Sequence, residues 1–145
     1  MQAAIGCAQI KKFPTFVEKR IHNFDRLKAA LAGCEDKLIL PEACDNARPS
    51  WFGFLITCKE GVDRNKVVPY IEAHGVQTRM LFAGNLIKHP CFDQMRASGK
   101  GYRVIGDLSV TDRVMNNTFW VGVYPGMTDE MIDYMAKTIT EAVNQ

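Results

Sequence analysis

Residues 51–58 read Trp-Phe-Gly-Phe-Leu-Ile-Thr-Cys and have the strongest strand character in the chain. Aromatic and β-branched residues dominate this run, and both types favour the pleated, half-buried surface of a sheet. Turn-forming residues stand on either side, with Pro49 before the run and Glu60-Gly61 after it. We therefore predict a strand over residues 51–58.

Helices are predicted on both sides of this strand. Pro14 suits a first helical turn, and apolar residues at spacings of three and four predict a helix over residues 14–32. Asp63 is placed to cap a helix that runs through His74, and Thr128 is placed to cap a final helix. The expected buried stripe of that final helix consists of Met131, Met135, Ile139 and Val143.

Three shorter runs also have strand character, at residues 38–41, 76–80 and 118–124. Residues 92–106 show no clear periodicity, whereas residues 107–116 are predicted to form a short helix. The short connections favour an antiparallel or mixed sheet of three to four strands with helices packed on one face. The predicted fold class is α/β, more narrowly an α+β small domain.

Composition and charge exclude several classes of protein. The 18 basic and 16 acidic residues leave a net charge of +2, which is too balanced to indicate binding to nucleic acid or an anionic membrane. No apolar run approaches the roughly 18 residues of a membrane span, and no signal peptide is recognisable, so we expect a cytoplasmic protein. The five cysteines include no C-x-x-C pair, which predicts reduced thiols and no metal site.

Residues 76–90, VQTRMLFAGNLIKHP, contain the first group of candidate binding residues. Arg79 offers a rigid fork of donors for phosphate, carboxylate or diol groups, and Asn85 offers both donors and an acceptor for sugar hydroxyls. Phe82 supplies an apolar anchor, and His89 is the one histidine with a functional interpretation. The alternative is a surface arginine and a turn asparagine without a ligand.

A second polar group precedes the predicted strand at residues 118–124. Arg113 and Asn117 are candidates for the same ligand, and the alternative is an asparagine that only ends a helix. His22 and His74 are expected to be a surface residue and a helix-closing residue. No H-E-x-x-H, G-x-S-x-G or phosphate-loop motif occurs, so we predict no catalytic residue in this chain.

The chain resembles a known family along its whole length. Its opening, MQAAIGCAQIKKFPTFVEKR, is similar to the helix that joins the large and small domains of the DegT/DnrJ/EryC1/StrS enzymes, which have the aspartate aminotransferase fold. The WFGFLI strand, the following helix with GVQTR, and YPGMTDEMI resemble that family's small domain. TRMLFAGNL and MNNTFWVGVYPG resemble its 3-dehydrase branch, above all the CDP-4-keto-6-deoxy-D-glucose 3-dehydrases of lipopolysaccharide biosynthesis.

This resemblance implies a cofactor, a substrate and partners for a complete enzyme. Such dehydrases use pyridoxamine or pyridoxal phosphate, and a histidine replaces the Schiff-base lysine of the aminotransferases. The CDP-sugar branch also holds an iron–sulfur cluster and receives electrons from a reductase, and the enzymes are homodimers. In the full enzyme we expect a sugar nucleotide to contact a set of residues flanked by Phe119: Arg79, Phe82, Asn85, His89, Arg113 and Asn117.

The resemblance also implies that the catalytic parts lie upstream of this sequence. The family's cofactor-binding aspartate, catalytic histidine or lysine, and cluster cysteines have no counterpart here. We therefore expect residues 1–13 to be the end of the linking helix and residues 14–145 to be the small domain. Alone, such a fragment is expected to be inactive and to bind neither the cofactor nor iron.

Two other interpretations remain open at this stage. The first is the small domain of a pyridoxal-phosphate-dependent sugar aminotransferase, which an upstream lysine in place of histidine would identify. The second belongs to another class, a stand-alone α/β dimerisation or binding module. It requires a natural N-terminus at Met1, and the uncapped helical character of residues 1–10 argues against it.

Overall fold

Four strands form one antiparallel sheet in the computed structural model, which describes residues 1–145. The strands are β1 (Leu38–Ile39), β2 (Gly53–Cys58), β3 (Thr78–Met80) and β4 (Thr118–Gly122). The α-helices are α1 (Gln2–Ile10), α2 (Phe13–Leu31), α3 (Arg64–Ala73), α4 (Asp93–Ser98), α5 (Ser109–Asn117) and α6 (Asp129–Val143). Short 3-10 turns stand at Ala32–Cys34, Leu86–Lys88 and Pro90–Phe92.

The order of strands across the sheet is β1-β2-β4-β3, so β2 and β4 are central. Alternate residues of these two strands, Phe54 and Ile56 on β2 and Phe119 and Val121 on β4, are fully buried. Successive side chains in a strand point to opposite faces, so these four share one face of the sheet. Helices α2, α3 and α6 contribute to the core on that face, which confirms the predicted fold class.

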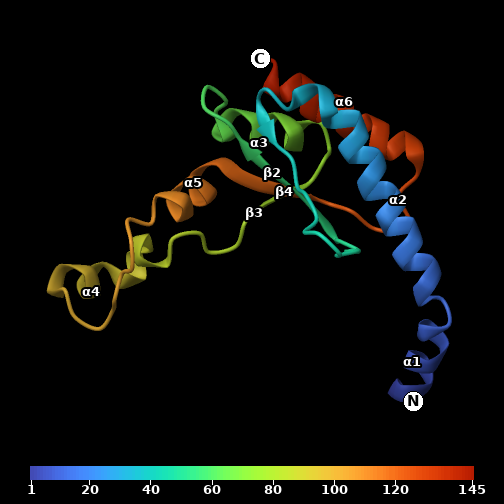
Figure 1. The fold of residues 1–145 in the computed structure, drawn as a ribbon, viewed down its shortest axis with the longest axis horizontal. Coiled ribbons are helices and arrows are strands. Elements are labelled where there is room, and N and C mark those ends of the chain that lie inside the picture. Colours follow the sequence, from blue (N-terminus) through green and yellow to red (C-terminus); the bar gives the residue numbers. More distant parts are fainter.

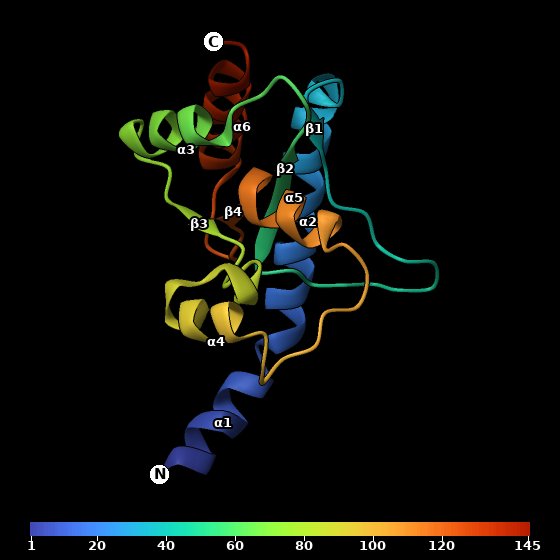
Figure 2. The same ribbon diagram turned by 90° about the vertical axis from the view of Figure 1, so that its left-hand side faces the viewer.

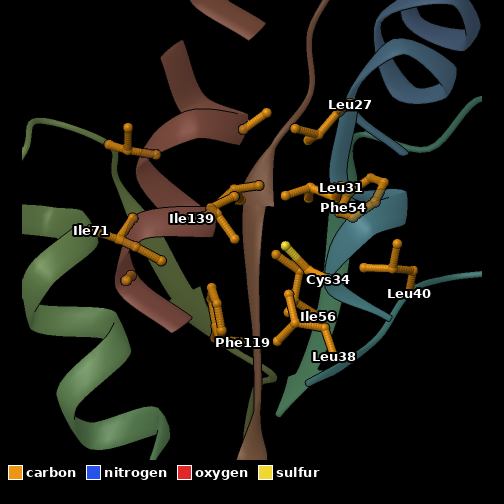
Figure 3. Close-up of a cluster of buried hydrophobic side chains, with 14 of the residues drawn as sticks. Leu27, Leu31, Cys34, Leu38, Leu40, Phe54, Ile56, Ile71, Phe119 and Ile139 are labelled. Atoms are coloured by element: carbon orange, nitrogen blue, oxygen red, sulfur yellow. The ribbon is translucent and has the colours of Figure 1, made fainter. Parts of the chain in front are cut away.

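The core is one continuous cluster. Figure 3 shows Leu27 and Leu31 of α2, Ile71 of α3 and Ile139 of α6 converging on the buried strand residues Phe54, Ile56 and Phe119. Each large side chain removed from water in this way contributes roughly 1.5–3 kcal/mol to folding. At one side of the layer, Arg26 of α2 also donates to Asp133 of α6 at 3.0 and 2.7 Å.

The predicted helix starts are confirmed at two side-chain caps. The Asp63 carboxylate accepts a hydrogen bond from the Asn65 backbone N–H at 2.9 Å, and the Thr128 hydroxyl accepts one from Met131 at 3.3 Å. Each bond satisfies a backbone donor that has no partner inside the helix. His74 closes α3, and Gly75 follows it with a φ of 78°, which a glycine adopts without strain.

Several boundaries differ from the prediction. β3 begins at Thr78, two residues later than expected, because Val76 instead closes the turn after α3 with a backbone bond to Ile71. β4 ends at Gly122, and β2 begins at Gly53. Residues 92–106, which show no periodicity, contain the short helix α4.

The predicted buried stripe of α6 is partly wrong. Ile139 and Val143 are buried as expected, whereas Met131 is 46% exposed and Met135 is half-buried. Ile132 occupies the place expected for Met131, and the remaining buried positions of the helix are Ala136, Thr138 and Ala142. The predicted stripe used spacings of four only, which drift off one face of a helix, whereas the buried stripe Ile132, Ala136, Ile139 and Val143 alternates spacings of four and three.

Helices α4 and α5 belong to an excursion between β3 and β4 that extends away from the sheet (Figures 1 and 2). At the opposite side, α1 continues beyond the N-terminal end of α2 and buries none of its residues (Figure 1). None of the helices has both the length and the apolar character that crossing a membrane requires.

Replacing Ile139 with alanine is expected to destabilise the chain by about 2–5 kcal/mol, because a fully buried side chain leaves a cavity. Met131→Ala, on the same helix, is expected to change the free energy of unfolding by no more than about 0.5 kcal/mol. Urea unfolding of both variants measures the difference. Equal losses of stability would contradict the orientation of α6.

The exposed apolar residues of α1 and of the start of α2 are expected to cause self-association. Ile5, Ile10 and Phe13 are all more than half exposed, and a helix of nine residues is marginal in water without packing. Light scattering should show a dimer or larger species, and the double change Ile5→Glu and Ile10→Glu should shift it towards monomer. A wild-type chain that stays monomeric at high concentration would refute this expectation.

Candidate functional site

The sheet face opposite the helices carries a row of side chains from three strands. Leu55 of β2 pairs with Trp120 of β4, and Trp120 pairs in turn with Arg79 of β3. The Trp120 ring lies directly over Gly53, where an added Cβ would be 2.7 Å from the ring atom Cε3. Phe52 meets the same ring edge-on at 5.5 Å between centroids. This row is the candidate binding face, because its neighbours are apolar and Arg79 is exposed with no partner in the chain.

Phe82 extends this face at the start of the excursion. Its side chain is 79% exposed, and its backbone has a φ of 43°, a conformation that few non-glycine residues adopt. Phe82, Leu81, Phe52 and Trp120 line a small apolar recess of about 120 Å³. The predicted role of Phe82 as an exposed apolar anchor is therefore compatible with its place beside the row.

Asn85 is buried and bound within the chain, whereas a direct contact with a ligand would require it to be accessible. It is 3% exposed, and its Nδ2 donates to the Asp112 carboxylate of α5 at 2.7 Å. Lys88 donates to the same carboxylate at 2.7 Å. The preceding Gly84, with a φ of 61°, lies so close to Met115 that an added Cβ would meet its Cγ at 2.4 Å. The turn at residues 83–88 is therefore clamped onto α5.

Asp112 is the centre of this clamp, and no sequence motif selects it as a functional residue. The donors on Lys88 and then Asn85 hold the pKa of the Asp112 carboxyl below its ordinary value. A lowered pKa means that the folded state favours the charged form of this carboxylate. A pairing partner 27 positions from Asn85 has no local sequence signal, because only the folded excursion brings the two together.

His89 joins the end of the same turn to its beginning. Its ring Nε2 contacts the backbone oxygen of Ala83. Arg96 of α4 donates to the backbone oxygens of Ile87 and His89 and to the Asp93 carboxylate. These contacts give His89 a local structural role.

The second candidate group is divided between two environments. Arg113 is exposed on α5, whereas Asn117 donates from Nδ2 to the backbone oxygen of Cys58 at 3.2 Å and ties the end of α5 to β2. Phe119, expected beside the ligand, is wholly buried on the helix-covered face. The flanking aromatic residue is Trp120, one position later, because alternation along β4 places it on the opposite face.

Breaking the Asp112 clamp is expected to loosen residues 83–89. Asp112→Ala removes the acceptor of two charge-assisted hydrogen bonds, so amide hydrogen exchange in this turn should accelerate on the order of tenfold. Hydrogen exchange with mass spectrometry measures it, with the exposed Asp45→Ala as the matched control. Unchanged exchange in residues 83–89 would show that other contacts hold the turn.

The clamp should also respond to acid. Because the pKa of Asp112 is lowered in the folded chain, its stabilising effect is complete above the ordinary aspartate pKa of about 3.9. The effect is lost as the pH falls below that value and through the lowered pKa. The side-chain amide resonances of Asn85 in NMR spectra should therefore stay constant from pH 7 to 5 and shift only at lower pH.

Comparison with known proteins shows relatives along nearly the whole chain. The sequence profile of the DegT/DnrJ/EryC1/StrS aminotransferase family matches residues 1–140. The lipopolysaccharide biosynthesis protein RfbH of Salmonella typhimurium is 48% identical over 143 residues, 97% of this chain and 32% of that protein. The dTDP-4-dehydro-2,6-dideoxy-D-glucose 3-dehydratase of Saccharopolyspora spinosa is 43% identical over 145 residues, 99% of this chain and 30% of that enzyme. The chain spans about a third of the length of these curated relatives.

Solved structures show the same fold. The E. coli GDP-4-keto-6-deoxy-D-mannose-3-dehydratase with bound hydrated PLP superposes with a TM-score of 0.78 at 25% identity, over 94% of this chain and 34% of that one. An aminotransferase from Psychrobacter cryohalolentis, at 19% identity, shares the fold with a TM-score of 0.80 over 100% of this chain and 39% of its own. By its sequence match and its architecture, this chain belongs to the DegT/DnrJ/EryC1/StrS family.

Proposed function

We propose that this chain is the small C-terminal domain of a pyridoxamine-phosphate-dependent sugar-nucleotide 3-dehydrase. The observation that carries the proposal is 43% identity, over 99% of the chain, to a sugar-nucleotide 3-dehydratase. The 48% identity to a lipopolysaccharide biosynthesis protein supports the finer assignment. In that assignment the substrate is CDP-4-keto-6-deoxyglucose, which loses its C-3 hydroxyl on the way to an O-antigen dideoxysugar.

The geometry divides the proposed substrate-binding residues into two roles. Arg79, Phe82 and Arg113 are exposed and are proposed to contact the sugar nucleotide directly. Asn85, His89 and Asn117 are engaged in hydrogen bonds within the chain, so we assign them to positioning the turn and the end of α5. An exposed arginine among apolar side chains matches the usual make-up of a ligand site, which places few polar groups in apolar walls.

We propose no cofactor site within this chain. No lysine or histidine lines the cavity of about 600 Å³ at the β3 edge of the sheet, and no three His, Cys, Asp or Glu side chains gather as a metal site. In the proposal, the pyridoxal or pyridoxamine phosphate, which supplies the electron sink for dehydration, is held by upstream residues of the full protein. An iron–sulfur cluster, an electron-donating reductase, a homodimer and a cytoplasmic location belong to the same proposal.

The second candidate function is that of a sugar-nucleotide aminotransferase small domain. The fold of this chain is as similar to the Psychrobacter aminotransferase, with a TM-score of 0.80, as it is to the dehydratase structure. The identity to the aminotransferase is only 19%. A stand-alone α/β module is less favoured, because the family match extends over residues 1–140 rather than a part of them. The two enzymes differ in the upstream catalytic residue, histidine in one and lysine in the other.

A domain exchange tests the proposal. This chain would replace the matching 30% of the Saccharopolyspora spinosa 3-dehydratase and, in parallel, the matching 39% of the Psychrobacter aminotransferase. We expect the dehydratase chimera to consume dTDP-4-dehydro-2,6-dideoxy-D-glucose and the aminotransferase chimera to be inactive, with circular dichroism showing that both fold. Activity in the aminotransferase host alone would replace the proposal with the second candidate.

Arg79→Ala in the dehydratase chimera is expected to weaken substrate binding by about 1.5–3 kcal/mol, because a charged hydrogen bond to the substrate is lost. Since Arg79 is exposed and has no partner in the chain, the melting temperature should not change. Steady-state kinetics and thermal melting measure the two effects, with the exposed Arg103→Ala as control. Unchanged kinetics would make Arg79 an ordinary surface residue, and a large fall in melting temperature would make its role structural.

A further inference from the structure

The excursion at residues 81–117 is joined to the rest of the chain by two side-chain hydrogen bonds. Asn117, the last residue of α5, donates to the backbone oxygen of Cys58 at 3.2 Å. The other bond comes from Arg64, the first residue of α3, whose Nη1 donates to the backbone oxygen of Met115 at 2.5 Å. Helix α5 lies between the sheet and α4 (Figure 1), so these two bonds attach the excursion near its base.

The position of Arg64 is unfavourable for its own helix. Apart from the capping Asp63, no acidic residue stands at the start of α3, and a cation at the N-terminus opposes the helix dipole. Arg64 takes part in no ion pair of the chain. The stability of α3 therefore does not account for an arginine at this place.

The guanidinium of Arg64 instead meets the C-terminal end of α5. The last carbonyl oxygens of a helix have no partner inside it, and a positive charge beside them is favourable. Besides the Met115 oxygen, the same Nη1 reaches the backbone oxygen of Thr118 at 3.4 Å. The Nε of Arg64 is buried there without a partner of its own. Arg64 is therefore placed to stabilise the end of α5, from a helix outside the excursion.

Met115 connects this bond to the turn at residues 83–88. Its sulfur accepts a hydrogen bond from the Asn85 backbone N–H at 3.3 Å, and its Cγ would lie 2.4 Å from a Cβ added at Gly84. The same helix carries Asp112, which binds Asn85, and the exposed Arg113. One residue thus binds Arg64 through its backbone oxygen and the turn through its side chain.

We propose that Arg64 is a positioning residue. By holding the backbone oxygen of Met115, it fixes α5 and residues 83–88 against the sheet, and so places Arg113 and Phe82 for the ligand. Arg64 acts through Met115 and not by ligand contact, because its Nη1 is directed at backbone oxygens of the chain. The inference rests on the proposed function for the choice of a sugar nucleotide as the ligand.

Hydrogen exchange with mass spectrometry tests the attachment. Arg64→Met keeps most of the side-chain length but removes every donor, so exchange in residues 83–88 and 112–117 should accelerate on the order of tenfold. Exchange in α3 should stay the same or become slower, because a cation leaves its N-terminal end. Arg64→Lys retains a donor and should restore part of the protection. Lys66→Met removes an exposed cation from the first turn of the same helix and is the matched control.

Two results would overturn the attachment. Unchanged exchange in residues 112–117 of Arg64→Met would show that other contacts hold α5. Acceleration of equal size in α3, β2 and α5 would show that Arg64 stabilises the chain as a whole and has no particular effect on the excursion.

Kinetics test the consequence for the ligand. In the dehydratase chimera, Arg64→Met should raise KM about tenfold and change kcat much less, because the displaced groups bind the substrate and do not carry out the chemistry. Arg64→Lys should recover part of the loss, and Lys66→Met should behave as the unmodified chimera.

The two proposals fail in distinguishable ways. An active chimera in which Arg64→Met accelerates exchange in residues 112–117 but leaves KM unchanged would preserve the proposed function and refute the positioning role. A chimera that folds but is inactive without any change at Arg64 would refute the 3-dehydrase assignment, and hydrogen exchange alone would then decide whether Arg64 holds α5.

Discussion

The antiparallel pairing of β2 with β4 is the constraint on which the rest of this structure depends. The two central strands pair residues that lie 61 positions apart where Thr57 meets Thr118 and 69 positions apart where Gly53 meets Gly122. The register places Phe54 beside Val121 and Ile56 beside Phe119 on the helix-covered face. A slip of one residue would bring Trp120 and Leu55 into the core and move the buried set to the open face.

The open face depends on the same register through one close contact. Trp120 lies flat enough over Gly53 that any side chain there would require the indole to move. Trp120 in turn stands beside Arg79 in the row of side chains on this face. It lines both the apolar recess with Phe82 and the cavity at the β3 edge. A glycine on β2 therefore determines the shape of the surface that carries the candidate ligand contacts.

Local sequence signals predicted elements well and long-range contacts poorly. The caps at Asp63 and Thr128 were predictable because both act within three residues, and the strands at residues 53–58 and 118–122 because their composition is apolar and β-branched. The burial of Asn85 was not predictable, since it depends on Asp112 and on the path of the intervening α4. Met131 was misplaced for another reason: apolar periodicity does not distinguish a methionine that lines a cavity from one that fills the core.

Trp120 lines both the apolar recess beside Phe82 and the cavity at the β3 edge, and Arg79 lines that cavity as well. A sugar nucleotide is an extended molecule with a base, a central diphosphate and a sugar, so a single cation near its middle is an efficient anchor. Under the proposed function, the absence of a partner for Arg79 within the chain suits this task, because an internal ion pair would compete with the ligand for its donors.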